Sequence, residues 1–274
     1  MARPLWFVEI LKRHFNLRYI GAELTKWPVI GYIMEKALFN GHNTGDALFY
    51  LPKDHVVINQ QIQEEDSIVI PSEVVKHFIK QSSYHFLMNE CICRVANDCQ
   101  NYPHNLGCLF LGEGVLDINP KLGRMVTKEE ALEHETRCQE EGLVHLIGRD
   151  KIDAVWMGVT PSTKLMTICN CCPCCCLFKF LPNLAPKLRA KITRMPGVSV
   201  IVTDNCTGCG VCAEDVCFVD VIKIEKGRAI ISDECRGCGV CVEICPQGAI
   251  QLIIEDKNYV DNAITRLSQA VNVK

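Results

Sequence analysis

Two stretches of this chain, DNCTGCGVC at residues 204–212 and DECRGCGVC at residues 233–241, repeat each other at an offset of 29 residues. They share an aspartate, three cysteines, two glycines and a valine in register. Each is followed by a fourth cysteine, Cys217 or Cys245, and then by an isoleucine-rich stretch that predicts a strand. The repeat therefore predicts two copies of one loop-and-strand unit, with a hairpin turn around Gly227 between VIKIE and AII.

Cysteine sets this sequence apart, with 19 residues in a chain of 274. A chain of this length can bury a sizeable core and does not need disulfides to stabilise it. The count is odd, and many of the thiols stand in C-x-C, C-x2-C or C-C-C runs, where neighbouring residues cannot easily form an unstrained disulfide. The cysteines therefore favour metal ligation.

The repeated stretches have the spacing that an iron–sulfur cluster needs. Three thiolates on one tight loop can face three irons of a cubane, and the intervening glycines let backbone N–H groups approach the sulfur atoms. The pattern C-x2-C-x2-C-x4-C followed by C-x2-C-x2-C-x3-C-P resembles the bacterial-type ferredoxin domain with two [4Fe-4S] clusters, over residues 198–254. Two structural zinc ribbons are the alternative, because they also use C-x2-C pairs.

The resemblance implies a ligand set for each cluster, in which the fourth cysteine of each run crosses to the other cluster. Cluster I would take Cys206, Cys209, Cys212 and Cys245, and cluster II would take Cys235, Cys238, Cys241 and Cys217. The first run has one extra residue before Cys217, and Phe218 stands where the family usually has proline. We therefore expect altered geometry or potential at cluster II. Val211, Val240, Ile222 and Ile250 are expected to provide the apolar packing around both clusters.

A second cysteine-rich stretch, CICRVANDCQNYPHNLGC, covers residues 91–108 and reads as a loop. Its four thiols suffice for a third closed cluster, with a structural zinc site as the alternative. They are Cys91, Cys93, Cys99 and Cys108. Arg94 could donate to inorganic sulfide or offset the negative charge of a cluster. His104 could replace one thiolate, but a solvated loop histidine is the simpler explanation.

The third run, CNCCPCCC, gathers six cysteines, namely Cys169, Cys171, Cys172, Cys174, Cys175 and Cys176. In an extended chain, Cys172, Cys174 and Cys176 would point to one side and the other three to the opposite side. We expect one side to ligate a cluster and the other to complete the site of residues 91–108 or to bind a further centre. A dithiol or metal-trafficking role is the alternative. Cys138 is expected to be a buried apolar thiol.

The remaining sequence predicts an α+β protein: a cysteine-rich α/β region followed by the ferredoxin-like dicluster domain with its pseudo-twofold repeat. Ser72 is expected to cap a helix with an apolar stripe, and Thr127 and Glu130 form a capping box for the helix KEEALEHETRCQEE. GLVHLIGRDKIDAVWMGV is expected to form two short strands. The expected segments are a Cys-free packing or partner domain at 1–90, a Cys-rich domain at 91–176, a basic linker at 177–197, the ferredoxin domain at 198–254 and a C-terminal helix at 255–274.

Several functions find no support in the sequence. The net charge of -3 argues against general nucleic-acid binding, and no G-x4-G-K-[ST] motif for nucleoside triphosphates occurs. Gly112 and Gly114 lack the third glycine of a dinucleotide-binding motif. No stretch reaches the roughly 18 apolar residues of a transmembrane segment, and no secretory cleavage pattern follows the N-terminus, so a cytoplasmic location is expected.

The C-x-C-R loop, the capped helix and the CNCCPCCC run ahead of the ferredoxin pattern resemble 4Fe-4S dicluster domain-containing proteins of anaerobic prokaryotes, from about residue 30 onward. The ferredoxin pattern together with the upstream cysteines implies an electron-transfer protein, or a subunit of an anaerobic redox complex, that passes low-potential electrons through several [4Fe-4S] clusters. We expect two clusters in residues 198–254, one or two more upstream, a redox partner protein and no substrate site of its own. The alternatives are a reductase with a non-standard catalytic cluster at residues 169–176, or an Fe–S cluster assembly or carrier protein. The acidic C-terminal third and the basic residues 177–196 are candidate docking surfaces; the alternative is that the basic run only screens nearby anionic clusters.

Overall fold

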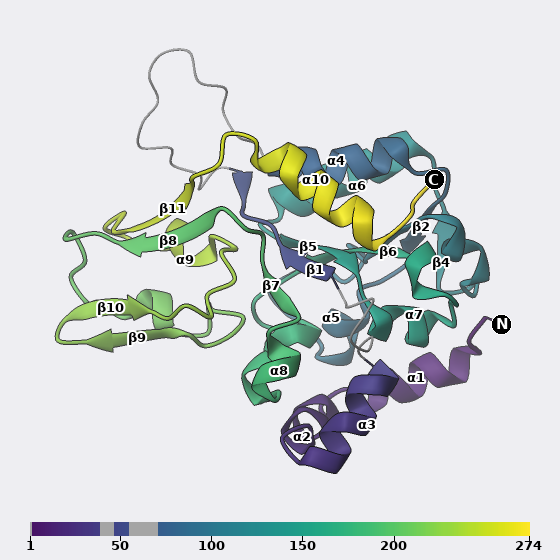
Figure 1. Cartoon of the computed structure of the whole chain (residues 1–274), viewed down its shortest axis with the longest axis horizontal. Coiled ribbons are helices and arrows are strands. Elements are labelled where there is room, and N and C mark those ends of the chain that lie inside the picture. Colours follow the sequence, from purple (N-terminus) through teal and green to yellow (C-terminus); the bar gives the residue numbers. More distant parts are fainter. Residues whose placement is uncertain (1, 39–46, 55–70) are drawn as a thin grey trace.

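The structure is a computed structural model, and it describes residues 2–38, 47–54 and 71–274 (Figure 1). Its α-helices are α1 (Leu5–Arg13), α2 (Leu17–Leu24), α3 (Pro28–Leu38), α4 (Ser72–Gln81), α5 (Ile92–Ala96), α6 (Lys128–Glu140), α7 (Lys151–Met157), α8 (Pro186–Arg189), α9 (Val240–Glu243) and α10 (Tyr259–Ala270). Its strands are β1 (Ala47–Tyr50), β2 (His85–Met88), β3 (Leu109–Leu111), β4 (Gly123–Met125), β5 (Val144–Arg149), β6 (Met166–Cys171), β7 (Ile192–Arg194), β8 (Val198–Val202), β9 (Ile222–Glu225), β10 (Arg228–Ile231) and β11 (Ile250–Ile254). The 3₁₀ helices are η2 (Glu113–Asp117), η3 (Ser162–Lys164), η4 (Leu177–Asn183) and η5 (Val211–Ala213). This mixture of helices and strands agrees with the expected α+β class.

A seven-stranded sheet forms the centre of the larger part of the molecule, in the order β4-β2-β3-β6-β5-β1-β7. Every neighbouring pair is antiparallel except β1 and β7. Strand β6 is central and pairs with β3 on one side and with β5 on the other, so that Cys171 lies opposite Val144. We call this sheet with its helices the sheet domain.

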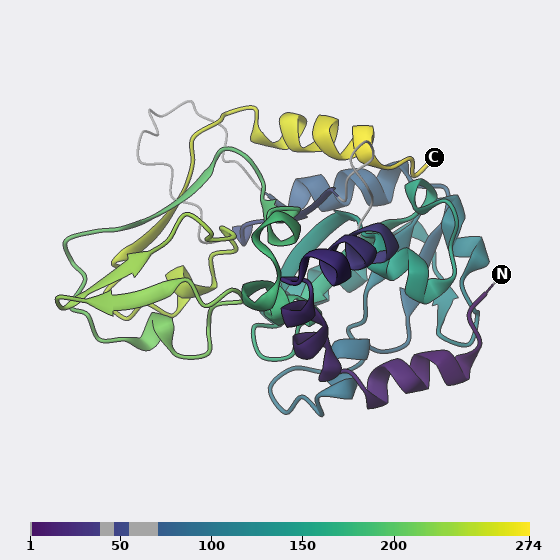
Figure 2. The same ribbon diagram turned by 60° about the horizontal axis from the view of Figure 1, so that its bottom comes forward.

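Helices cover both faces of the sheet, so successive residues of a strand enter two different cores. Phe49 and Leu51 pack with α4, α6 and α10, whereas Leu48 and Tyr50 face η4 on the other side. Figure 2 shows α10 and the N-terminal helix α1 on opposite sides of the sheet. On β6 the same alternation separates Ile168 from its neighbours Cys169 and Cys171.

Two helices form largely as their sequences predict. The apolar stripe of α4 is buried, although Pro71 occupies the N-cap position and Ser72 is the first helical residue. In α6 both hydrogen bonds of the capping box between Thr127 and Glu130 are present. Both helices can be predicted from the sequence because the capping box and the apolar stripe each depend on residues three or four positions apart.

The prediction of two strands in residues 142–159 was half wrong. Residues 144–149 do form β5, but α7 follows immediately. The side chain of Asp150 accepts a hydrogen bond from the Ile152 backbone N–H and caps this helix. Asp150 is an N-cap rather than part of a polar turn between strands.

The structure also differs from the expected segment boundaries. Strands β1 and β2 come from residues 1–90 yet lie in the same sheet as β3 to β6, so residue 90 is not a domain boundary. The segment at 177–197 is not a linker, because η4 buries Leu177, Phe178, Phe180 and Leu181 and β7 pairs with β1. Apolar residues at four positions of this basic run explain why it packs.

The basic residues of this segment are partly used inside the molecule. Arg189 forms an ion pair with Glu234 at 2.5 Å, and Lys187 and Lys191 both pair with Glu35 of α3. Arg194 donates to the Cys235 carbonyl at 3.4 Å. The segment therefore holds the C-terminal repeats against the sheet domain.

The repeated stretches fold as two small antiparallel units, which we call the repeat region, residues 198–254. Strand β8 pairs with β11, and β9 pairs with β10 in the expected hairpin around Gly227. The repeat region extends sideways from the sheet domain, with the β9–β10 hairpin facing away (Figure 1). Val240, Ile222 and Ile250 are buried as expected, but Val211 is 42% exposed.

The N-terminal helices α1 to α3 leave an unusual number of large apolar side chains in solvent. These are Leu5, Trp6, Ile10, Leu17, Ile20, Trp27, Val29, Tyr32 and Ile33. An apolar surface of this kind is more than the scattered exposed residues of an ordinary monomer. Among the described residues, no helix is long and apolar enough to cross a membrane.

Candidate metal centres

A small cavity at the outer end of the repeat region is lined by four cysteines, and we call it the first repeat cavity. They are Cys206, Cys209, Cys212 and Cys245, the set expected for cluster I. The cavity volume is about 10 Å³. Backbone N–H groups of Ala229 and Ala249 donate to the sulfur atoms of Cys206 and Cys245, both at 3.3 Å. Cys209 is exposed, so this cavity lies close to solvent.

The second repeat cavity lies nearer the sheet domain and has a volume of about 20 Å³. It is lined by Cys217, Cys235, Cys238 and Cys241, the set expected for cluster II. The Gly237 N–H donates to Cys235 Sγ at 3.4 Å. Burial raises the pKa of the Cys238 thiol to about 12, so a metal that binds here must displace thiol protons.

The two loops around these cavities share one backbone conformation. Gly208 and Gly237 have φ of 68° and 64°, and Gly210 and Gly239 have φ of 88° and 89°. A Cβ atom on Gly208 would lie 2.4 Å from the Gly227 carbonyl oxygen. Left-handed backbone and close approach both require glycine at this position.

We expect Gly208→Ala to destabilise the repeat region more than Gly227→Ala. Both residues have positive φ, which costs an L-residue about 1–2 kcal/mol, but a Cβ on Gly227 meets nothing within 4 Å. Gly227→Ala is therefore a control for backbone strain alone. Anaerobic thermal unfolding with iron quantification measures the difference, and equal losses for the two variants would show that the close approach is unimportant.

Phe218, which stands where proline was expected, packs between the repeat region and the sheet domain. It is 1% exposed, and its ring centroid lies 5.4 Å from that of Tyr50. Tyr50 is also fully buried, and its hydroxyl has no hydrogen-bond partner among the described residues. Burial first, then the thiols of Cys176, Cys171 and Cys238, raise the pKa of Tyr50 well above its ordinary value. Tyr50 lies in a Cys-free stretch, and nothing in its sequence context marks it.

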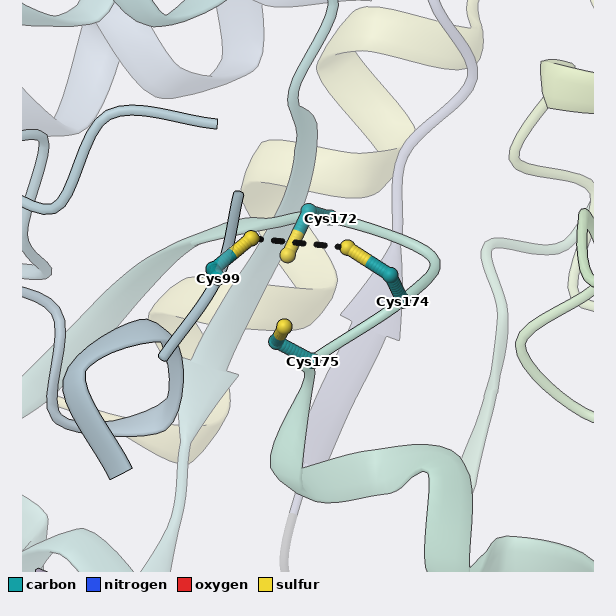
Figure 3. A group of neighbouring side chains, drawn as sticks. All are labelled: Cys99, Cys172, Cys174 and Cys175. Atoms are coloured by element: carbon teal, nitrogen blue, oxygen red, sulfur yellow. Dashed lines mark hydrogen bonds between the residues drawn. The ribbon is translucent and has the colours of Figure 1, made fainter. Parts of the chain in front are cut away.

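A third arrangement combines cysteines from two stretches, and we call it the four-cysteine group. Cys99 follows α5, while Cys172, Cys174 and Cys175 come from the turn after β6 (Figure 3). Their four sulfur atoms all lie within 4.8 Å of one another, and Cys99 and Cys174 are 3.6 Å apart. Tetrahedral coordination with bonds of about 2.3 Å places thiolates about 3.8 Å apart. The group therefore fits one tetrahedral ion such as zinc or iron.

The expected third cluster at residues 91–108 does not form as one site. Cys99 joins the four-cysteine group, whereas Cys91, Cys93 and Cys108 line a different cavity. Cys93 lies within α5, whereas Cys99 follows the end of that helix. His104 is not in the four-cysteine group and instead contacts the Cys99 carbonyl through Nε2 at 2.9 Å.

The predicted alternation of residues 169–176 holds only while the chain is extended. Cys169 and Cys171 share one face of β6, and Cys172 and Cys174 point to the other centre. Residues 173–175 form a turn, which places Cys175 with Cys172 and returns Cys176 to Cys171. The strand period ends where the turn begins.

One thiol stays outside all these sites. Cys138 of α6 is fully buried, and its Sγ lies 3.5 Å from His134 Nε2. It packs with Leu106 and Leu143. It belongs to the apolar core, as its place in the sequence predicts.

Comparison with known proteins identifies part of the repeat region. The family model described as 4Fe-4S binding domain matches residues 229–251, which include Cys235, Cys238, Cys241 and Cys245. No curated protein and no solved structure matches the chain. The chain thus contains a ferredoxin-type iron–sulfur domain, and the match supports at least one 4Fe-4S cluster.

Proposed function

We propose that this chain is an iron–sulfur electron-transfer protein, or a subunit of a redox complex, with two [4Fe-4S] clusters in the repeat region. Cluster I would be held in the first repeat cavity and cluster II in the second. When bound, a [4Fe-4S] cluster with four thiolate ligands takes up and releases an electron without binding substrate.

One observation carries this proposal: each repeat cavity gathers three cysteines of one run and the fourth cysteine of the other. Cys245 lines the first cavity, and Cys217 lines the second. The same crossing is typical of ferredoxins with two clusters. A pair of zinc ribbons would instead bring four thiols to single-ion distance, and neither set is among the groups whose ligand atoms lie within 4.8 Å in the described residues.

The residues present fit the clusters in chemistry as well as in number. All eight side chains are thiols, and N–H groups of Ala229, Gly237 and Ala249 already point at three of the sulfur atoms. Such donors stabilise the added negative charge of a reduced cluster and so set its potential.

The position of the two cavities gives the electron path a direction in space. Cys209 of the first cavity is exposed, which supports contact with a redox partner protein at that end. Residues of the second cavity pack in the same apolar core as Cys171 and Cys176 of the sheet domain, with Tyr50 and Phe218 beside them. Electrons would pass from the outer cluster to the inner one and then to centres in the sheet domain. The apolar surface of α1 to α3 supports the role as a subunit.

The proposal is tested on the full chain, purified and loaded with iron and sulfide without oxygen. We expect at least eight irons per chain, and dithionite reduction should produce EPR signals of reduced [4Fe-4S] clusters. Those signals should disappear when an oxidised acceptor protein is added. Iron without any reducible cluster signal would contradict electron transfer as the function.

A further inference from the structure

Six cysteines outside the repeat region line one further cavity in the sheet domain, which we call the six-thiol cavity. They are Cys91, Cys93, Cys108, Cys169, Cys171 and Cys176. The cavity volume is about 40 Å³, larger than the 10 and 20 Å³ of the two repeat cavities. Cys172 touches this cavity too, but its sulfur belongs to the four-cysteine group.

Several separate pieces of chain place these thiols. Cys91 is the N-cap residue of α5, and Cys93 is its second residue. Cys108 directly precedes β3, while Cys169 and Cys171 lie two positions apart on one face of the adjoining β6. Cys176 caps η4 after the turn. The convergence depends on the sheet and cannot be an effect of sequence proximity alone.

The sulfur atoms approach one another in pairs around the cavity. Cys108 and Cys169 are 3.6 Å apart, and Cys171 and Cys176 are 3.3 Å apart. The side chains of Cys91 and Cys93 also contact each other, as do those of Cys169 and Cys171. Four thiols are thus linked in one chain of contacts, and Cys91 and Cys93 form a second pair on the same cavity.

This set does not converge on a single ion. Within the residues that the structure describes, the four-cysteine group is the only set of three or more candidate ligands whose atoms all lie within 4.8 Å. The cysteine sets of the two repeat cavities, where the cubanes are expected, do not meet this distance either. Like the two repeat cavities, the six-thiol cavity does not bring all its thiols to single-ion distance, and it exceeds them in thiols and volume.

A buried cation beside the cavity points to a negatively charged occupant. Arg94 lines the cavity and is 0% exposed. Its guanidinium donates to the carbonyls of Asn170 and Leu106 and contacts the Cys172 thiol, and among the described residues its Nε has no partner. A buried guanidinium without an anion is costly, and Arg94 lies between the two centres, so thiolates in the six-thiol cavity and in the four-cysteine group would together balance its charge.

The rest of the wall is largely apolar, with Glu90, Asp153 and Asn170 as its polar members. Phe110, Trp156, Met157, Leu177 and Phe178 line the cavity beside the thiols. An apolar shell of this kind keeps a cluster in a low-dielectric environment and tunes its potential. The cavity has the donor atoms, the counter-charge and the largely apolar walls of a cluster site.

We propose that the six-thiol cavity binds an iron–sulfur cluster of more than four irons through all six thiolates. A cubane offers four irons with one thiolate each, so two of six ligands would have no iron. Each thiol gives up its proton on binding iron. This proposal rests on the proposed function only in requiring that the chain be loaded with iron and sulfide, and the two can fail separately.

The test compares anaerobic native masses and iron contents of the loaded full chain and of a variant. Cys108→Ala, Cys169→Ala and Cys171→Ala together leave three thiols in the cavity and remove none from the repeat region. Cys138→Ala is the matched control, since it removes a buried thiol outside every centre. We expect the triple variant to lose more than four irons, the control to lose none, and the EPR signals of the repeat region to persist in both.

A loss of four irons or fewer from the triple variant would overturn the proposal. If that variant does not fold, the wild type decides. The wild-type sample must first show full occupancy of both repeat-region clusters by EPR integration. Its native mass must then exceed that of three cubanes, one of them in the six-thiol cavity, and one ion in the four-cysteine group. A mass that three cubanes and one ion account for would overturn the proposal. A wild-type chain that holds the cavity iron but gives no EPR signals from the repeat region would overturn the proposed function instead.

Discussion

Replacing Cys238 and Cys241 by alanine is expected to remove four irons per chain and to stop reduction of the centres in the sheet domain. Both residues line the second repeat cavity, and neither lines the first. The variant should therefore retain a reducible cluster I and lose the relay between that cluster and Cys171, Cys176 and their neighbours. Its effect on electron transfer should be close to complete, because among the described residues the second repeat cavity is the only cysteine site of the repeat region in the core that joins the two parts.

The measurement is rapid-freeze EPR after mixing with a reduced partner protein or a protein-sized reductant that cannot enter the sheet domain. The matched control is Cys209→Ala with Cys212→Ala, which removes the outer cluster and also costs four irons. In that control a small reductant such as dithionite should still reduce cluster II and the inner centres. Normal reduction of the sheet-domain centres in the Cys238 and Cys241 variant would contradict the proposed path.

Replacing Cys172 and Cys174 by serine is expected to remove one metal ion and a large part of the stability of the sheet domain. The four-cysteine group joins the loop after α5 to the turn after β6, so a bound ion cross-links segments far apart in sequence. A ligand present at a thousand times its dissociation constant stabilises the folded state by about 4 kcal/mol. For a domain of this size, that loss lowers the melting temperature by roughly 8 to 16 °C.

Anaerobic calorimetry together with elemental analysis for zinc and iron measures both effects. Cys138→Ala is again the control, because Cys138 packs in the same apolar cluster as Cys99, Cys172 and Cys175 without being a ligand. The control should keep the ion and melt close to the wild type. An unchanged metal content in the serine variant would show that these thiols hold no ion.

Local signals in the sequence account for a good part of the fold. The capping box of α6, the apolar stripe of α4 and the β9–β10 hairpin all follow from residues a few positions apart. Asp150 was missed, because an N-cap directly after a strand looks like a polar turn. The place of β7 beside β1 was also missed, since strand pairing across more than 100 residues leaves no local pattern.

The repeat marked the eight cysteines of the repeat region through loops of fixed spacing and glycines that the backbone requires, and the resemblance to ferredoxins implied how they divide between two sets. The partition of the other eleven was decided only by the tertiary structure. Cys99 lies in the four-cysteine group and not with the other cysteines of residues 91–108. A turn places Cys175 and Cys176 on the sides opposite to those expected. Strand β6 places Cys169 and Cys171 beside the thiols that precede β3. Spacing can indicate a site when one loop supplies most of its ligands, whereas a site built from several distant segments exists only once a sheet has brought those segments together.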